Sequence, residues 1–151
     1  MEGYPMDSLR APALTLFLFT ASFLWCVETI AQSSSTQGVA VHLDSITHIN
    51  RAIRQVERLV DAHPGTQVRL ILIASAVEPA LEGAMDKNGG LYSAQLEQLL
   101  AKGVGIFACE TTLISLSKRP EELTFGVDTV PSGIAELARL QLESDYAYLK
   151  L

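Results

Sequence analysis

The sequence predicts an α/β fold in which five strands form one mostly parallel sheet with helices on both faces. Strand-like and helix-like segments alternate five times along the chain, which is the pattern of a doubly wound sheet. Two strand-like segments, 68–74 and 104–108, are almost wholly apolar, as expected of interior strands covered on both faces. About 120 residues remain once an amino-terminal leader is removed, which suits a single domain.

The domain is predicted to begin with a short strand at 39–43, after which Asp44 or Ser45 caps a helix. The apolar residues of this helix recur at three- and four-residue spacing, as one buried face requires. They are Ile46, Ile49, Ile53, Val56, Leu59 and Val60. The sequence His63-Pro64-Gly65 ends the helix, because proline and glycine do not readily continue one. The apolar strand at 68–74 follows.

A longer connection, 75–90, is predicted to contain a helical turn near 79–85. The sequence DKNGG at 86–90 then interrupts any regular structure. A second helix is predicted at 91–102, with four leucines among its apolar positions and Gly103 as its end.

The remaining elements complete the alternation. They are a strand at 104–108, a short helix at 111–117, a turn at 120–123, a brief strand at 126–130, a helix from the Ser132 cap through 143, and a last strand at 146–149. The last strand ends almost at the carboxyl terminus. Because little chain is left to cover a sheet edge there, subunit contact is predicted at this strand.

The first 31 residues are predicted to be a signal peptide. Residues 14–27 are apolar and uncharged, but shorter than the roughly 20 residues that span a bilayer. Thr29-Ile30-Ala31 supplies the small residues of a cleavage site, which leaves a polar linker at 32–38 and the α/β domain at 39–151. The expected location is therefore periplasmic or secreted, without membrane attachment after cleavage. The alternative is anchoring by an uncleaved amino-terminal helix.

The charged residues exclude several classes of function. Removing Glu2, Asp7, Arg10 and Glu28 with the leader leaves 14 acidic and 10 basic residues, without a basic stripe. Nucleic-acid binding is therefore not expected, since it depends on neutralising phosphates. Three scattered histidines have no metal-ligand spacing, and no phosphate-binding glycine loop is present, so neither a metal nor a cofactor is predicted.

Cys109 is the main candidate for chemistry, because cleavage of the leader removes Cys26 and leaves a single thiol. It lies where a strand becomes a helix, at the carboxyl edge at which open α/β sheets bind ligands. Helix amides favour a thiolate there, whereas the adjacent Glu110 carboxylate opposes one. The sequence therefore predicts either a reactive thiolate or a small buried structural residue.

Five polar residues are candidates for binding a substrate near Cys109: Ser75, Glu110, Thr111, Thr112 and Ser132. Ser75 follows the most apolar strand and would lie at the same sheet edge, unless it is only a turn residue. Thr111 and Thr112 begin a helix and could donate hydrogen bonds to an anion or cap backbone amides. Ser132 is placed either to cap the last helix or to hold an anion at its amino terminus.

Three segments resemble the DsrE/DsrF-like family of small α/β proteins: Gly103–Leu113 (GVGIFACETTL), Val130–Gln141 (VPSGIAELARLQ) and Tyr146–Lys150 (YAYLK). The resemblance implies a flavodoxin-like, three-layer fold and a homo-oligomer, a trimer or a hexamer. It also implies that Cys109 corresponds to the family's cysteine, which in some members carries sulfur as a persulfide. The chain would then be an exported, single-domain member.

Two classes of function follow. In the first, Cys109 accepts sulfane sulfur from a small sulfur compound or a sulfur-relay protein and passes it on. In the second, the chain is a non-catalytic, oligomeric module for ligand binding or assembly, in which Cys109 is structural.

Overall fold

The computed structural model describes residues 38–151. The predicted signal peptide and nearly all of the predicted linker lie outside these residues. Within the described part of the chain, no helix is both long and apolar enough to cross a membrane.

Five strands form one sheet in the order β4-β3-β2-β1-β5, and every pairing in it is parallel. The strands are β1 (Gly38–Leu43), β2 (Gln67–Leu72), β3 (Gly105–Cys109), β4 (Asp128–Val130) and β5 (Tyr146–Lys150). The prediction of a five-stranded, parallel α/β sheet is confirmed, as is the interior position of the two most apolar strands, β2 and β3. The last strand, β5, lies at one edge.

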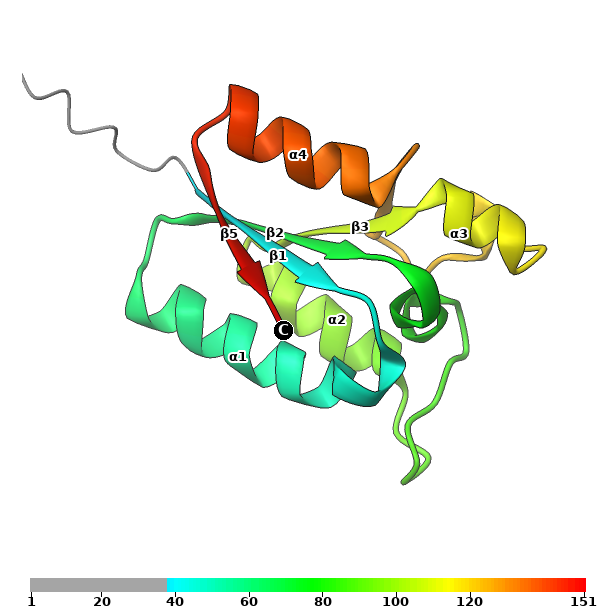
Figure 1. The fold of residues 1–151 in the computed structure, drawn as a ribbon. Coiled ribbons are helices and arrows are strands. Elements are labelled where there is room, and N and C mark those ends of the chain that lie inside the picture. The colour runs from blue at the N-terminus through cyan, green and yellow to red at the C-terminus, as the bar shows by residue number, and fades with distance from the viewer. Residues whose placement is uncertain (1–37) are drawn as a thin grey trace, which may run out of the picture. The chain divides into compact units, whose positions relative to one another are not determined.

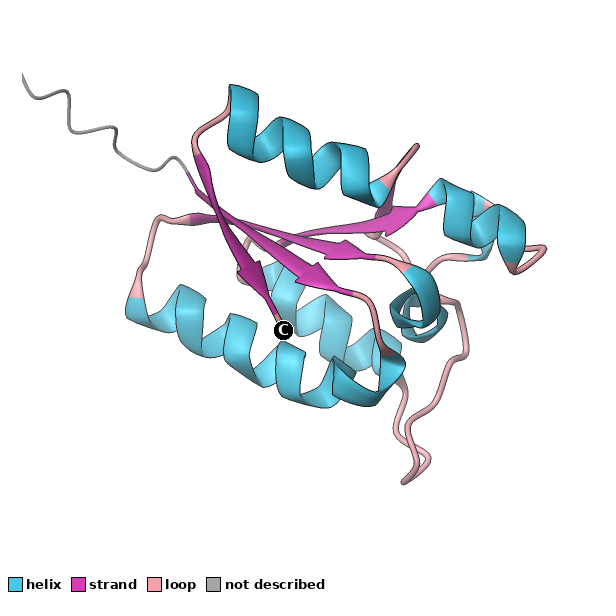
Figure 2. Ribbon diagram, in the orientation of Figure 1, coloured by secondary structure: helices cyan, strands magenta, loops and turns pink. Residues whose placement is uncertain are grey.

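Helices cover both faces of the sheet (Figure 1, Figure 2). The α-helices are α1 (Ile49–Ala62), α2 (Tyr92–Ala101), α3 (Glu110–Ser115) and α4 (Gly133–Glu143). Short 3₁₀ helices complete the fold: η1 (Ile46–His48), η2 (Ala74–Ala80) and η3 (Pro120–Glu122). Helices α1 and α2 lie on one face and α4 on the other, while α3 continues directly from β3 at the carboxyl end of the sheet. This is the predicted three-layer arrangement.

The larger core lies between the sheet and the α1–α2 layer, where Leu70, Leu72 and Ile106 of the strands are fully or almost fully buried. A smaller core on the opposite face joins α4 to the sheet through Leu137, Leu140, Ile71, Ala40 and Tyr146. The continuous apolar character of β2 therefore serves both cores, because its alternate side chains enter opposite layers.

The connection after β2 differs from its prediction. The helical turn expected near 79–85 begins earlier, as the 3₁₀ helix η2 at Ala74–Ala80. The backbone of Ala74 has φ of 52°, a left-handed conformation that non-glycine residues seldom adopt. This conformation turns the chain sharply as it leaves β2, so η2 starts at the carboxyl edge of the sheet.

Ser45 caps the short helix η1, because its side chain accepts a hydrogen bond from the Thr47 N–H, and helix α1 begins after η1.

Two side-chain contacts tie β5 to β1 at their carboxyl ends. His42 Nδ1 lies 2.8 Å from the Tyr148 hydroxyl, and Lys150 Nζ lies 2.6 Å from the Asp44 carboxylate. His42 is only 7% exposed, and its Nε2 has no hydrogen-bond partner among residues 38–151. Burial lowers the pKa of His42 below its ordinary value of 6.5, the Lys150 ammonium lowers it further, and Asp44 acts in the opposite direction.

We expect the protein to lose stability as the pH falls below 6.5. The unfolded chain binds a proton on this histidine more readily than the folded protein does, so the stabilisation is complete above 6.5 and is lost as the pH falls through the lower, folded pKa. Urea unfolding between pH 8 and pH 5 measures this dependence. His42→Gln should flatten it, whereas His63→Gln, which changes an exposed histidine, should retain it. An unchanged slope in His42→Gln would contradict the assignment.

Candidate functional site

Cys109 is the last residue of β3 and the residue that precedes α3. The strand ends and the helix begins without an intervening loop, which fixes the Cys109 side chain at the carboxyl edge of an interior strand. The residue is 4% exposed, and it is the only cysteine in the described part of the chain. The sequence therefore predicted correctly that Cys109 lies at the junction of strand and helix. Its side chain is more buried than we expected for a residue at an open sheet edge.

Hydrogen-bond donors converge on the sulfur from two helices. The Gly133 N–H, at the start of α4, donates to Cys109 Sγ at 3.3 Å. The Thr111 and Thr112 N–H groups and the Thr112 hydroxyl, all in the first turn of α3, also favour the thiolate and so lower the pKa of Cys109. Burial by itself raises the pKa of Cys109 and is the largest single influence on it. The four groups together outweigh burial, so that the pKa lies below its ordinary value.

Thr112 is oriented by a second hydrogen bond. The Ala74 N–H donates to Thr112 Oγ1 at 3.2 Å. Because the oxygen accepts from this side, its own hydrogen is free to point toward the sulfur. The left-handed turn at Ala74, the first residue of η2, therefore directs its backbone N–H into the hydroxyl of Thr112, one of the groups that lower the pKa of Cys109.

Gly133 permits the close approach of α4 to the sulfur. A Cβ atom on this residue would lie 2.6 Å from Cγ1 of Ile73, 2.8 Å from its Cδ1, and 3.2 Å from Cγ2 of Ile71. A side chain at this position would therefore force a shift of the start of α4 or of the Ile73 side chain. Ser132 caps this helix as predicted, by accepting a hydrogen bond from the Ala135 N–H at 3.4 Å.

Glu110 and Thr111 join α3 to the neighbouring β4 region. The Glu110 carboxylate accepts a hydrogen bond from the Thr129 hydroxyl at 2.6 Å, and the Thr111 hydroxyl donates to the Pro131 carbonyl at 3.0 Å. The first contact holds the acidic side chain toward β4. The second fixes the loop that leads into Gly133.

Ser75 has a different role from the one predicted. It follows β2 as expected, but its hydroxyl accepts from the Ile46 N–H at 3.1 Å and donates to the Asp44 carbonyl at 3.5 Å. It therefore joins η2 to the loop after β1. Thr111, Thr112 and the Ser132–Gly133 turn are brought together around Cys109, and Ser75 is engaged elsewhere.

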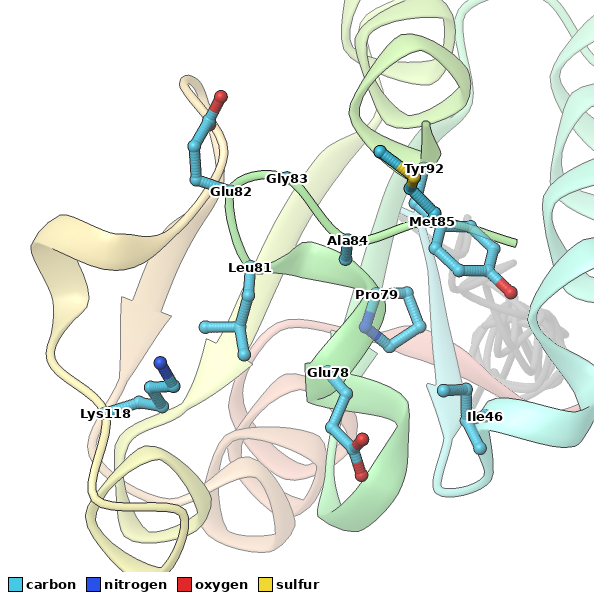
Figure 3. A pocket seen from close by; sticks show the side chains of 10 residues that line it. All are labelled: Ile46, Glu78, Pro79, Leu81, Glu82, Gly83, Ala84, Met85, Tyr92 and Lys118. Carbon is cyan, nitrogen blue, oxygen red and sulfur yellow. The ribbon is translucent and has the colours of Figure 1, made fainter. Parts of the chain in front are cut away.

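A shallow hollow of about 340 Å³ lies apart from these residues (Figure 3). Its lining comes from η1, η2, the loop after η2, the start of α2 and the segment after α3, and includes Glu78, Leu81, Met85, Tyr92 and Lys118. Cys109 and the predicted substrate-binding residues are not part of this lining. Among residues 38–151, no group of three or more His, Cys, Asp or Glu side chains is arranged to hold a metal ion.

Sequence reasoning missed two members of the site, Ala74 and Gly133. The sequence does contain an indication of the role of Gly133. A glycine in the first turn of a helix, directly after a serine cap, weakens that helix, so its presence there indicates a steric requirement. No feature of the sequence marks Ala74, because its contribution is a backbone N–H, which every residue except proline has.

Comparison with solved structures finds the same fold in several proteins. The ychN protein of E. coli has 23% sequence identity and a TM-score of 0.65, covering 76% of this chain and 99% of its own. The protein of unknown function MTH1491 from Methanobacterium thermoautotrophicum has 23% identity and a TM-score of 0.63, covering 75% and 96%. BT1422 from Bacteroides thetaiotaomicron, also of unknown function, has 15% identity and a TM-score of 0.59, covering 79% and 98%.

No curated protein sequence matches the chain. The family comparison is decisive, because the profile of the DsrE/DsrF-like family matches residues 30–151, which includes every described strand and helix. The strand that ends in Cys109, the capped helix at Gly133 and the carboxyl-terminal strand all lie within that match. The chain therefore belongs to the DsrE/DsrF-like family.

Proposed function

We propose that Cys109 accepts a sulfane sulfur and passes it on as a persulfide. The observation that supports this proposal is the hydrogen bond from the Gly133 N–H to the sulfur. Together with the polar groups in the first turn of α3, it lowers the pKa of the thiol despite its burial. The thiolate is the species that attacks a sulfur–sulfur bond, so a group that ionises readily is the first requirement of a sulfur carrier.

The transfer of sulfur to Cys109 and onward requires no cofactor. The Cys109 thiolate attacks the outer sulfur of a donor R–S–SH, a new S–S bond forms, the donor's S–S bond breaks, and R–S⁻ leaves with the bonding electron pair. The product on the protein is Cys109–S–SH. An acceptor thiolate then attacks its outer sulfur and releases Cys109 as the thiolate, so no net oxidation or reduction takes place. The donor is a small sulfur compound or a sulfur-relay protein.

The same donor groups also favour the step in which the outer sulfur is transferred from Cys109 to an acceptor. When an acceptor takes the outer sulfur, negative charge returns to Cys109 Sγ, where the Gly133 N–H and the first-turn N–H groups of α3 stabilise it. The Thr112 hydroxyl, which accepts a hydrogen bond from the Ala74 N–H, favours the thiolate in the same direction. The site thus favours both the attacking and the departing thiolate.

A second candidate function rests on the 4% exposure of Cys109. A free cysteine this buried commonly acts as a small core residue. In this alternative the chain is an oligomeric ligand-binding or assembly module, and the hydrogen bonds to the sulfur serve to join α3 and α4 at the sheet edge.

Mass spectrometry distinguishes the two functions. The folded protein carrying Cys26→Ser, treated with sodium polysulfide at neutral pH, is expected to gain the mass of one sulfur atom on Cys109, and a thiol reductant should remove it. Cys109→Ser in the same background should gain none, while its circular dichroism spectrum stays that of the parent, because serine is nearly isosteric. A folded parent protein that remains unmodified, and whose thiol reacts only after denaturation, would favour the structural alternative.

Export is a further part of this proposal. Cleavage after Ala31 would place sulfur transfer in the periplasm or outside the cell, and the mature chain would begin at Gln32. The intact mass of protein expressed from the full-length gene measures this directly. A full-length, membrane-extracted product would instead support the uncleaved anchor.

A further inference from the structure

The edge strand β5 presents an unpaired and largely apolar edge. It is the terminal strand of the sheet, and no other strand in residues 38–151 pairs with its outer side. Tyr148 is 45% exposed and Leu149 is 39% exposed, although both belong to a regular strand of five residues. A strand edge of this kind pairs readily with another strand unless something blocks it.

The opposite edge of the sheet is protected in a way that β5 is not. Strand β4 has only three residues, begins with the exposed Asp128, and is followed directly by Pro131. Short length, charge and proline are the features that discourage edge pairing. The one charged residue of β5, Lys150, is already paired with Asp44 of its own chain at 2.6 Å. Of the two edges, only β5 is therefore suited to accept a further strand.

The hydrogen bonds of β5 show which of its residues face outward. The Leu151 N–H donates to the His42 carbonyl, so the backbone groups of residues 147, 149 and 151 point toward β1. Alternate residues of a strand direct their backbone groups to opposite sides. The N–H and C=O groups of Tyr146, Tyr148 and Lys150 therefore form the free edge, and Tyr148 is at its centre.

We propose that β5 pairs with β5 of a second copy of this chain, antiparallel and about a twofold axis at Tyr148. In this register Tyr148 faces Tyr148 of the other copy and exchanges a pair of backbone hydrogen bonds with it. Tyr146 faces Lys150 of the other copy in the same manner at each end. The strand is thus complementary to itself, and the sheets of two copies become continuous.

The side chains agree with this register on both faces of the strand. On the α4 face, the two Tyr148 rings become cross-strand neighbours, which is a favourable aromatic pairing. On the other face, Ala147 lies opposite Leu149 of the second copy, so exposed apolar side chains cover one another. The two Lys150 ammonium groups lie at opposite ends of the pairing, which keeps like charges apart. A second copy is therefore favoured over a partner of unrelated sequence.

Disulfide trapping tests the register. Ala147 and Leu149 of the other copy form a non-hydrogen-bonded pair, whose Cα atoms lie about 4.5 Å apart, within the range that a disulfide spans. In a full-length chain carrying Cys26→Ser and Cys109→Ser, the double variant Ala147→Cys/Leu149→Cys should form a covalent dimer under mild oxidation. Each single variant should form little, because identical positions are diagonal neighbours about 7–8 Å apart. Equal trapping in the single variants, or none in the double variant, would overturn the proposal.

A proline variant tests the pairing without disturbing the core. The Tyr148 N–H points outward, so Tyr148→Pro leaves the β1–β5 ladder intact while it removes the central donor of the edge. Tyr148→Thr loses the same ring and the same contact with His42 but retains the N–H. Light scattering should show Tyr148→Pro at half the mass of the parent assembly or less, whereas Tyr148→Thr, although weakened by the loss of the ring pairing, should still reach the parent mass at higher protein concentration. A parent protein that is monomeric or an isolated trimer would refute a twofold contact, as would occupation of this edge by residues 1–37 of the same chain.

Discussion

Gly133→Ala is expected to destabilise the protein by about 1–3 kcal/mol and to make the Cys109 thiol harder to ionise. The added methyl group would meet Ile73 Cγ1 at 2.6 Å, a distance at which either the start of α4 or the Ile73 side chain must shift, and we expect α4 to move away from the sheet. The Gly133 N–H moves with it and is lost from Cys109 Sγ. In an unconstrained helix, alanine would stabilise by up to about 1 kcal/mol relative to glycine, so the sign of the effect is itself informative.

Urea unfolding and titration of the thiol measure the two effects together. Ile73→Ala is the matched control, because it removes the two atoms with which the new methyl group collides. The double variant Gly133→Ala/Ile73→Ala should recover part of the lost acidity, and a double-mutant cycle should show coupling between the two positions. If Gly133→Ala is as stable as the parent and its thiol ionises at the same pH, the close approach of α4 does not control the site.

Thr112→Val is expected to raise the thiol pKa and to cost about 0.5–1.5 kcal/mol of stability, because it removes the acceptor of the part-buried hydrogen bond from the Ala74 N–H. The substitution preserves the shape of the side chain and removes only its hydroxyl group. Cys109 then loses one of the four groups that lower its pKa, while the backbone N–H groups of Thr111 and residue 112 remain.

Thr112→Ser is the matched control for this prediction, because it retains the hydroxyl and removes a methyl group. We expect it to preserve the low thiol pKa and the rate of persulfide formation, with a smaller loss of stability. The two variants should therefore differ in the titration of the thiol more than in folding. A valine variant that ionises like the serine variant would show that the hydroxyl has no part in activating Cys109.

Much of the fold could be predicted from the sequence, because the apolar patterns are local. The almost wholly apolar segments 68–74 and 104–108 indicated interior parallel strands, and β2 and β3 occupy those positions. The order of the five strands could not be predicted in this way, since it depends on contacts between residues far apart in the chain. The early start of η2 was also missed, because it depends on the left-handed backbone of Ala74, and alanine gives no sign of it.

The candidate site was predictable where the residue type carries the chemistry. Cys109, Thr111 and Thr112 lie within four consecutive residues. The junction of strand and helix places the polar groups of the two threonines where they lower the pKa of Cys109. Gly133 and Ala74 come from other parts of the chain and act through backbone N–H groups, which the sequence does not distinguish. Ser75 was expected beside the thiol because it follows β2, yet η2 turns its hydroxyl toward the loop after β1.

Activation of Cys109 can be measured directly by a pH titration of its thiolate in the folded protein. Ultraviolet absorbance of the parent, minus that of Cys109→Ser at each pH, isolates this group from the tyrosines. We expect a pKa below that of the same cysteine in urea-denatured protein, since the Gly133 hydrogen bond and the polar groups of the first turn of α3 outweigh the burial of the thiol. A pKa equal to or above the denatured value would contradict it, because burial would then prevail and Cys109 would be a structural thiol.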